Sequence, residues 1–239
     1  MACPGARAGK RAADAAIAGG VPTCGLRQTG SNPSRGPRER RKLALMEDGE
    51  HRELMIAAIA AEGVAHAALV DGDLEGALAA YADAVQKYRA SWALAPPKSY
   101  GRLVGLLKAA VLGGHANAAA TEVREALDGD ADAAGSPVAS YVLAVAALIL
   151  DDDDAVAPLA DDMDPRGGAF ERTATALRAL AAGDGPAYAA AVAAIEADFA
   201  ERDEHLTGVA IADTAIMLEL IARERGLAAE LDSPLVRLP

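Results

Sequence analysis

Aromatic residues, cysteine and lysine are all scarce in this chain of 239 residues. It contains only two Phe and one Trp, although apolar residues make up 52% of it and Ala is the commonest of them. A core of such small side chains favours helices that pack closely together. Val, Ile, Thr and Tyr never alternate with polar residues over a convincing run, so we expect no β-sheet.

The two cysteines, Cys3 and Cys24, both lie in the first 45 residues, and no metal-ligand spacing surrounds them. From residue 46 onward the sequence has no cysteine. That absence excludes disulfides, a thiol nucleophile and a zinc-thiolate site from this part of the chain.

Residues 1–45 differ in composition from the rest of the chain. They carry nine Lys or Arg against two acids and are rich in Gly, Pro and Ser, without a sustained apolar period. We predict a disordered basic tail over residues 1–45 and a helical domain over residues 46–239. Helix-like sequence follows Met46 at once, so the alternative is that the tail is upstream sequence translated from a misassigned start.

The charge of residues 46–239 limits the partners that we expect. Fourteen Lys or Arg stand against thirty-three acids, a net charge of about −19, which repels nucleic acid and anionic membranes. Gly19, Gly20 and Pro22 interrupt the one candidate for a secretory signal, and we find no transmembrane segment. We therefore expect a cytoplasmic protein that binds neither nucleic acid nor membrane. This excess of acidic over basic residues resembles that of proteins from salt-loving microbes. The alternative is an ordinary acidic protein encoded by a GC-rich genome.

Apolar residues recur every three to four positions from Glu50 onward, with Gly, Pro or Asp at the breaks. This pattern predicts an all-α fold of about nine helices joined by short connections, so that neighbours run antiparallel. The predicted helices cover residues 49–70, 74–92, 99–113, 115–128, 137–150, 153–162, 168–182, 185–201 and 207–225. Thr207 is the predicted N-cap of the last one, and Leu235 and Leu238 are expected to lie against the helices.

Two of the predicted turns have the same sequence pattern. Gly72-Asp73 and Gly183-Asp184 each place a glycine after one helix and a capping acid before the next. They lie 111 residues apart, about three periods of 37, a spacing typical of stacked helical hairpins. Residues 138–150 are apolar on every side, which predicts a centrally buried helix.

The stretch Glu62 to Val85, EGVAHAALVDGDLEGALAAYADAV, resembles a tetratricopeptide repeat. The matching positions are Ala65, Gly72, Ala77, Tyr81 and Ala84, whereas Ala61 and Ala68 replace the usual Trp and Tyr of the first helix. The resemblance implies a short solenoid of stacked hairpins, for which a compact helical bundle is the alternative. Arrays of this family bind extended peptides along an inner groove.

A second resemblance rests on the C-terminal sequence. A Leu-rich last helix is followed by Arg225-Gly226, then Ser233-Pro234 and Leu238-Pro239, a pattern similar to some immunity proteins of bacterial toxin systems. This resemblance implies a protein that neutralises a cognate toxin.

No residue set in the sequence forms a recognisable active site. His51, His66, His115 and His205 have no paired spacing, and no glycine-rich phosphate loop is present. The acids of residues 151–154 and 161–164 lack the glycine and distal Glu of a calcium loop, so we expect solvated turns. We predict no catalytic residue, no metal and no cofactor.

One span stands apart as a candidate binding surface. It gathers aromatic and basic side chains, which are favoured anchors in protein contacts. The candidate partner-binding residues are Tyr88, Arg89, Trp92, Lys98, Tyr100 and Arg102. In the other interpretation, Trp92 packs beneath the Pro96-Pro97 loop and the basic residues neutralise nearby acids.

The leading hypothesis is a non-catalytic helical-repeat scaffold that binds a protein or peptide partner. The first alternative is an immunity protein that neutralises a cognate toxin. The second is an enzyme that uses scattered carboxylates, which would require a deep pocket where they converge.

Overall fold

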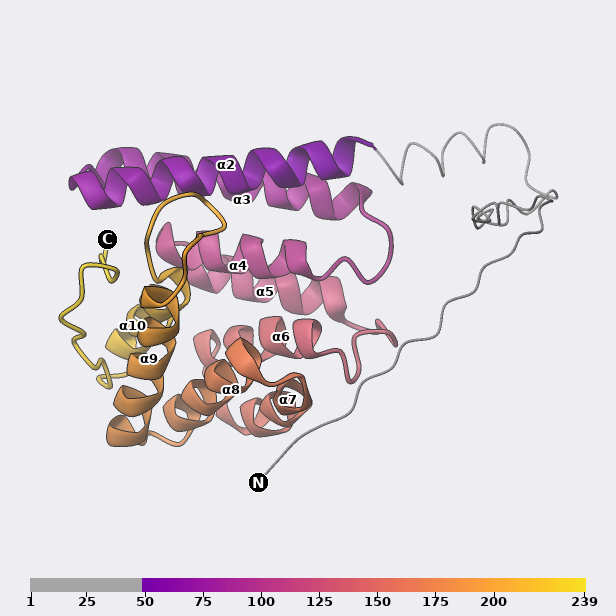
Figure 1. Cartoon of the computed structure of the whole chain (residues 1–239). Coiled ribbons are helices and arrows are strands. Elements are labelled where there is room, and N and C mark those ends of the chain that lie inside the picture. Colours follow the sequence, from indigo (N-terminus) through magenta and orange to yellow (C-terminus); the bar gives the residue numbers. More distant parts are fainter. Residues whose placement is uncertain (1–48) are drawn as a thin grey trace, which may run out of the picture. The chain divides into compact units, whose positions relative to one another are not determined.

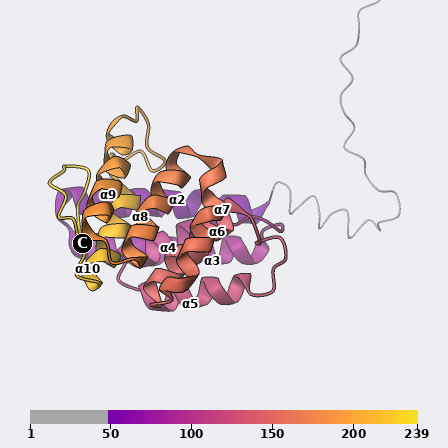
Figure 2. The ribbon, with the colours of Figure 1, turned by 90° about the horizontal axis from the view of Figure 1, so that it is seen from below.

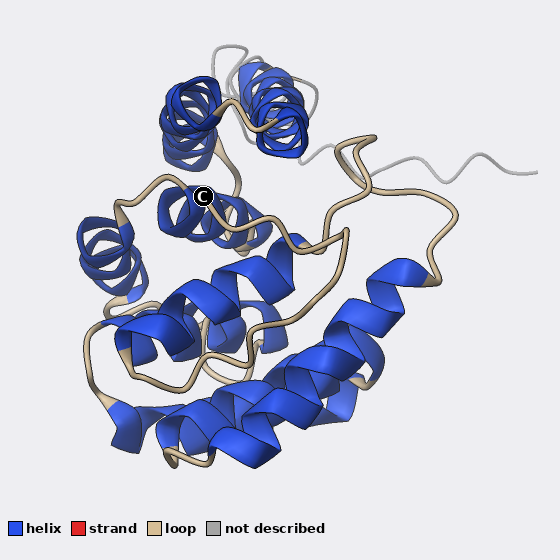
Figure 3. Cartoon of the chain, turned by 90° about the vertical axis from the view of Figure 1, so that its left-hand side faces the viewer, coloured by secondary structure: helices blue, strands red, loops and turns tan. Residues whose placement is uncertain are grey.

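Nine α-helices account for most of residues 49–239, the part of the chain that the computed structural model describes. Within it there are helices and loops but no strand (Figure 3), so the predicted all-α class is confirmed. The helices are α2 (Glu50–Asp71), α3 (Leu74–Leu94), α4 (Gly101–Leu112), α5 (Ala116–Leu127), α6 (Pro137–Ile149), α7 (Val156–Met163), α8 (Gly168–Ala181), α9 (Gly185–Ala200) and α10 (Asp213–Glu224). Two 3-10 turns, η1 (Asp153–Ala155) and η2 (Asp164–Arg166), flank α7. The predicted tail of residues 1–45 lies outside the described residues.

The two predicted glycine-acid turns form as expected. Gly72 has a φ of 79° and Gly183 a φ of 66°, in the left-handed region that glycine tolerates. The next residue caps the following helix in both places: the Asp73 carboxylate accepts from the Gly76 N–H at 2.9 Å, and that of Asp184 from the Ala187 N–H at 3.0 Å. The glycine and the capping acid in the local sequence therefore determine both turns between helices.

The helices pack in chain order. Each helix from α2 to α9 contacts the next, and α2, α4, α6 and α8 also contact one another in series (Figure 1). The first helix of each hairpin thus stacks on the first helix of the next. As predicted, α6 is buried along most of its length.

Small residues allow these close contacts. A Cβ added to Gly105 of α4 would lie 2.3 Å from Cζ of Tyr88, so glycine is required where the ring of α3 meets the α4 backbone. Alanines such as Ala77, Ala84 and Ala109 are fully buried for the same reason.

The last helix closes the series and starts later than predicted. It packs on α4 and α9 (Figure 2). It begins at Asp213, not near residue 207, and its N-cap residue Ala212 gives no side-chain cap. The prediction that Thr207 caps this helix is wrong, because the Thr207 hydroxyl lies 2.9 Å from Nδ1 of His66 on α2.

The C-terminal segment after α10 lies against the helices, as predicted for Leu235 and Leu238. Its main anchor is Glu219 of α10, which is fully buried. The Glu219 carboxylate accepts hydrogen bonds from the Tyr188 hydroxyl at 2.7 Å and from the N–H groups of Ala229 and Glu230, both at 3.0 Å. One buried acid thus joins α9, α10 and the chain terminus.

Candidate functional site

The six residues of the predicted aromatic and basic surface lie on α3, on α4 and on the loop between them. Two of the three aromatic rings are enclosed: Tyr88 is 1% exposed and Tyr100 is 3% exposed. The Tyr88 hydroxyl donates to Glu62 at 2.6 Å, and that of Tyr100 donates to Asp130 at 2.9 Å. Trp92 is half-buried, with its ring centroid 6.2 Å from that of Tyr100.

The three basic residues of that surface each contact a side chain of this chain. Arg89 donates two hydrogen bonds to Glu122, both at 2.6 Å. Lys98 pairs with Asp132 at 2.9 Å. Arg102 donates to the Ser91 hydroxyl at 2.8 Å and to His51 at 2.7 Å. These contacts agree with a role in joining helices, and the binding of a partner by this span stays a prediction.

A buried polar cluster that was not predicted from the sequence lies beneath α2. Its centre is an ion pair between Nζ of Lys108 on α4 and Oδ2 of Asp213 on α10, 2.5 Å apart. Glu62 and His66 of α2 complete the cluster and are 2% and 1% exposed. The one available signal was Lys108 itself, a cation between the apolar residues Leu106-Leu107 and Ala109-Ala110 of α4.

The pKa values of the cluster show which charges the protein stabilises. Burial raises the pKa of Glu62, even though Lys108 opposes that shift. Burial is the largest single influence on both groups and alone would raise the pKa of Asp213 and lower that of Lys108. Their mutual attraction and hydrogen bond, together with the attraction of Glu62 for Lys108, outweigh it, so the pKa of Asp213 is lowered and that of Lys108 is raised. The protein therefore favours the ionised Lys108–Asp213 pair.

The neutral form of His66 is favoured by burial, which lowers its pKa to about 4. Between pH 6.5 and about 4, His66 is protonated in the unfolded chain but stays neutral in the folded chain. Protonation therefore favours the unfolded chain, and the free energy of unfolding decreases as the pH falls through this range. Between pH 7 and pH 4.5 we expect the wild type to lose about 2 kcal/mol more than His66→Gln does.

Urea denaturation at the two pH values measures this difference. The matched control is His115→Gln, which makes the same replacement at an exposed histidine at the start of α5, outside the buried cluster. Equal losses in the wild type and in His66→Gln would contradict the burial of a neutral imidazole.

The polar cluster also fixes which side of α2 meets solvent. Because Glu62 and His66 point inward, the opposite side of the helix carries an exposed stripe that we call the outer α2 face. It consists of Ile56, Ala60, Val64, Ala67 and Val70. Ile56 is 68% exposed and Val64 is 62% exposed, and no charged side chain other than the buried Glu62 lies between Glu53 and Asp71. α2 is therefore apolar on both sides, because its inner side also buries Ala58, Ala61, Ala65 and Leu69. A surface helix usually presents polar side chains to solvent instead.

Exposed aliphatic residues are concentrated on this first hairpin. Seven large hydrophobic residues are exposed in residues 49–239, and five of them lie between residues 56 and 78. They are Ile56, Val64 and Val70 on α2, and Leu74 and Leu78 at the start of α3. Such clustering marks a surface for contact more often than scattered single residues do.

By length and composition, α2 is also the one described helix that could cross a membrane, although no transmembrane segment was predicted from the sequence. It has 22 residues, its most apolar window has a mean hydropathy of 1.6, and 33% of that window is buried. In this fold the inner side of α2 carries Glu62, whose carboxylate accepts from Tyr88 of α3, and a packed core helix passes the same test of length and composition.

The acidic clusters of the sequence pair with arginines in the structure. Arg225 donates to Asp153 at 2.6 Å and also contacts Asp151, and Arg178 donates to Asp161 at 2.7 Å and Asp164 at 2.5 Å. Within residues 49–239, no three His, Cys, Asp or Glu side chains gather as metal ligands would.

No family model, curated protein or solved structure matches this chain.

Proposed function

We propose that this protein is a non-catalytic helical scaffold that binds a protein partner through the outer α2 face. The observation that supports this most strongly is the orientation of α2, which buries Glu62 and His66 and leaves Ile56 and Val64 in solvent. Leaving these aliphatic side chains in water has a free-energy cost, which a partner covering the outer α2 face would offset. The resemblance of residues 62–85 to a tetratricopeptide repeat supports the same class of function.

The charge at the C-terminal end of the stripe indicates the kind of partner that this surface would bind. At the C-terminal end, Asp71, Asp73 and Glu75 follow the last exposed valine, and no basic residue lies among them. A helical partner with an apolar face and basic residues at the end that meets these acids would match this surface in shape and charge.

The same charges disfavour two other occupants. A second copy of this chain with its α2 parallel to this one would bring the acidic C-terminal end of α2 against the same acidic end. A membrane surface is disfavoured because helices that lie on membranes carry Lys or Arg on their polar flanks.

Two synthetic helical peptides with the same leucine-rich face test the proposal, one with lysines at its ends and the other with glutamates. In fluorescence anisotropy the lysine peptide should bind more tightly, and its affinity should fall as salt is added. Replacing Ile56 and Val64 with Ser should weaken its binding by at least about tenfold.

The control is Leu94→Ser, which removes an exposed aliphatic side chain from the far end of α3. It should leave peptide binding unchanged. Equal binding of both peptides, or unchanged binding by the Ile56/Val64 double variant, would overturn the proposal. Binding of neutral phosphatidylcholine vesicles that depends on Ile56 and Val64, or dimerisation in light scattering, would replace it with a membrane or a self-association surface.

A further inference from the structure

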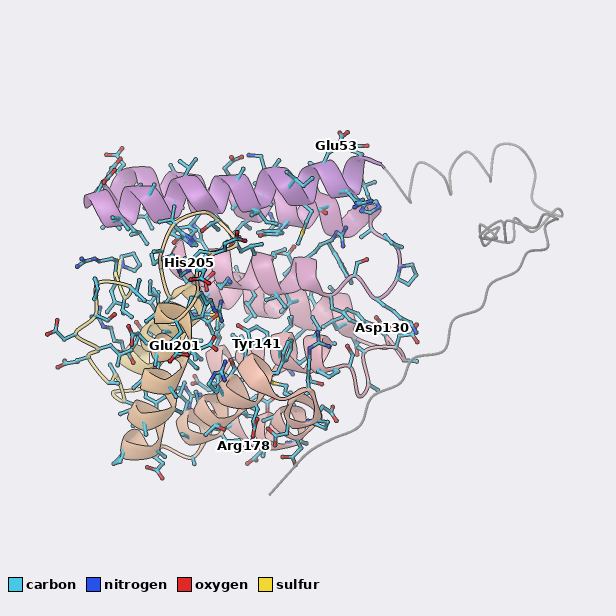
Figure 4. All side chains as sticks on the ribbon, viewed as in Figure 1. Glu53, Asp130, Tyr141, Arg178, Glu201 and His205 are labelled. Atoms are coloured by element: carbon cyan, nitrogen blue, oxygen red, sulfur yellow. The ribbon has the colours of Figure 1, made fainter. Side chains whose placement is uncertain are left out.

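A cavity of about 250 Å³ opens between α4, α8, α9 and the loop that joins α9 to α10, away from the outer α2 face. Its walls are mainly apolar and include Phe170, Ile195, Phe199 and Ile211. Figure 4 labels two further lining residues, Tyr141 on α6 and His205 on the loop after α9. The volume equals that of about eight liquid waters, which fits a single ring or a short aliphatic chain.

Polar groups with unused hydrogen-bonding capacity also line this cavity. Lys108 has three ammonium protons, and the described contacts give it one acceptor, Asp213. Nε2 of His66 and Nδ1 of His205 are buried, and neither has a hydrogen-bond partner in the described part of the chain. Buried polar atoms without partners are uncommon, and here two occur in residues that line the cavity. The Lys108 ammonium, which also lines it, has protons left to donate to an acceptor from outside the chain.

The charges around the cavity are already matched to one another. Lys108 pairs with Asp213 at its floor, and Arg172 and Arg202 both pair with Asp198 at its rim. Acidic Glu201 and Asp203 flank Arg202 in the chain, which offsets the second arginine. A ligand with a net charge would have to lose its hydration and compete with these pairs, whereas a neutral one would not.

We propose that this cavity binds a small neutral molecule with a ring or short aliphatic body and one hydrogen-bond acceptor that faces Lys108. The apolar body packs between Phe170 and Phe199 and the neighbouring isoleucines, and a carbonyl or hydroxyl oxygen accepts from the Lys108 ammonium. This site does not depend on the outer α2 face, so either proposal can fail without the other.

Four probes that share a benzene ring test the site: benzamide, toluene, benzoate and benzylammonium. Methyl NMR of isoleucine-labelled protein follows their binding, because Ile195 and Ile211 line the cavity and Ile56 lies on the outer α2 face. Benzamide should shift the Ile195 and Ile211 methyl signals without moving that of Ile56. Its affinity should exceed that of toluene by about tenfold, the value of one hydrogen bond, and should exceed that of both charged probes.

A pair of alanine variants places the binding within the cavity. Ala169 lines its opening and Ala187 does not, and both are exposed near the start of a helix, on α8 and α9. Ala169→Phe should abolish the benzamide shifts, and Ala187→Phe should retain them, while the circular dichroism of both matches the wild type. The proposal is overturned if benzamide leaves Ile195 and Ile211 unmoved, if charged probes bind as tightly, or if Ala169→Phe still binds.

Discussion

Replacing Lys108 with Met should lower the free energy of unfolding by about 3–5 kcal/mol, because it leaves buried acids without a cation. Asp213 is 8% exposed and Glu62 is 2% exposed, and Lys108 is the cation whose attraction acts on both. Guanidinium denaturation at pH 7, followed by circular dichroism, measures the loss.

Two controls separate this effect from the loss of a long side chain. Lys87→Met removes the cation of an exposed pair with Asp83 on α3 and should change stability by about 0.5 kcal/mol or less. Adding Asp213→Leu to Lys108→Met should recover part of the lost stability, because the unpaired acid is then removed as well. If Lys108→Met were no more harmful than Lys87→Met, the ion pair would not hold α4 and α10 together.

Replacing Glu219 with Ala should destabilise the protein by about 3 kcal/mol and release the C-terminal segment. The Tyr188 hydroxyl and the N–H groups of Ala229 and Glu230 would lose their shared acceptor, and each buried group without a partner costs about 1–3 kcal/mol, partly recovered when water enters. Denaturant unfolding measures the stability, and hydrogen exchange of residues 227–239 measures the release.

Glu224→Ala is the matched control, because Glu224 is exposed at the end of the same helix. It should change neither the stability nor the exchange of the terminal segment. Slow exchange of residues 227–239 in Glu219→Ala would show that aliphatic contacts such as those of Leu235 and Val236 are sufficient to hold the terminus.

The ends of a helix could be predicted from the sequence where they depend on residues close by in the chain. Gly72-Asp73 and Gly183-Asp184 determine their turns through the conformation of the glycine and the capping carboxylate, both local properties. The start of α10 could not be predicted in this way. Thr207 has the right chemistry for a cap, but its hydroxyl lies beside His66, 141 residues earlier in the chain, and only the folded structure brings the two together.

The functional surfaces were harder to predict, because a local sequence does not show which side chains find partners. Arg89, Lys98 and Tyr100 suggest a binding surface when taken with their neighbours, yet their contacts Glu122, Asp132 and Asp130 lie about 30 residues away. The outer α2 face was missed for a related reason. The sequence of α2 is apolar on nearly every side, so it does not show which side meets solvent. The contacts of Glu62 and His66 identify the inner side and leave the outer α2 face exposed.

The position of α10 affects how this architecture could change in evolution. Open arrays of helical hairpins lengthen when a hairpin is duplicated, because the end of the array offers a free surface to the added unit. Here α10 turns back onto α4, and the loop before it contacts α2, where a Cβ on Gly63 would lie 2.9 Å from the carbonyl oxygen of Thr207. A hairpin inserted after α9 would have to displace this closing helix, so variation in length is expected within loops and not by addition of whole hairpins.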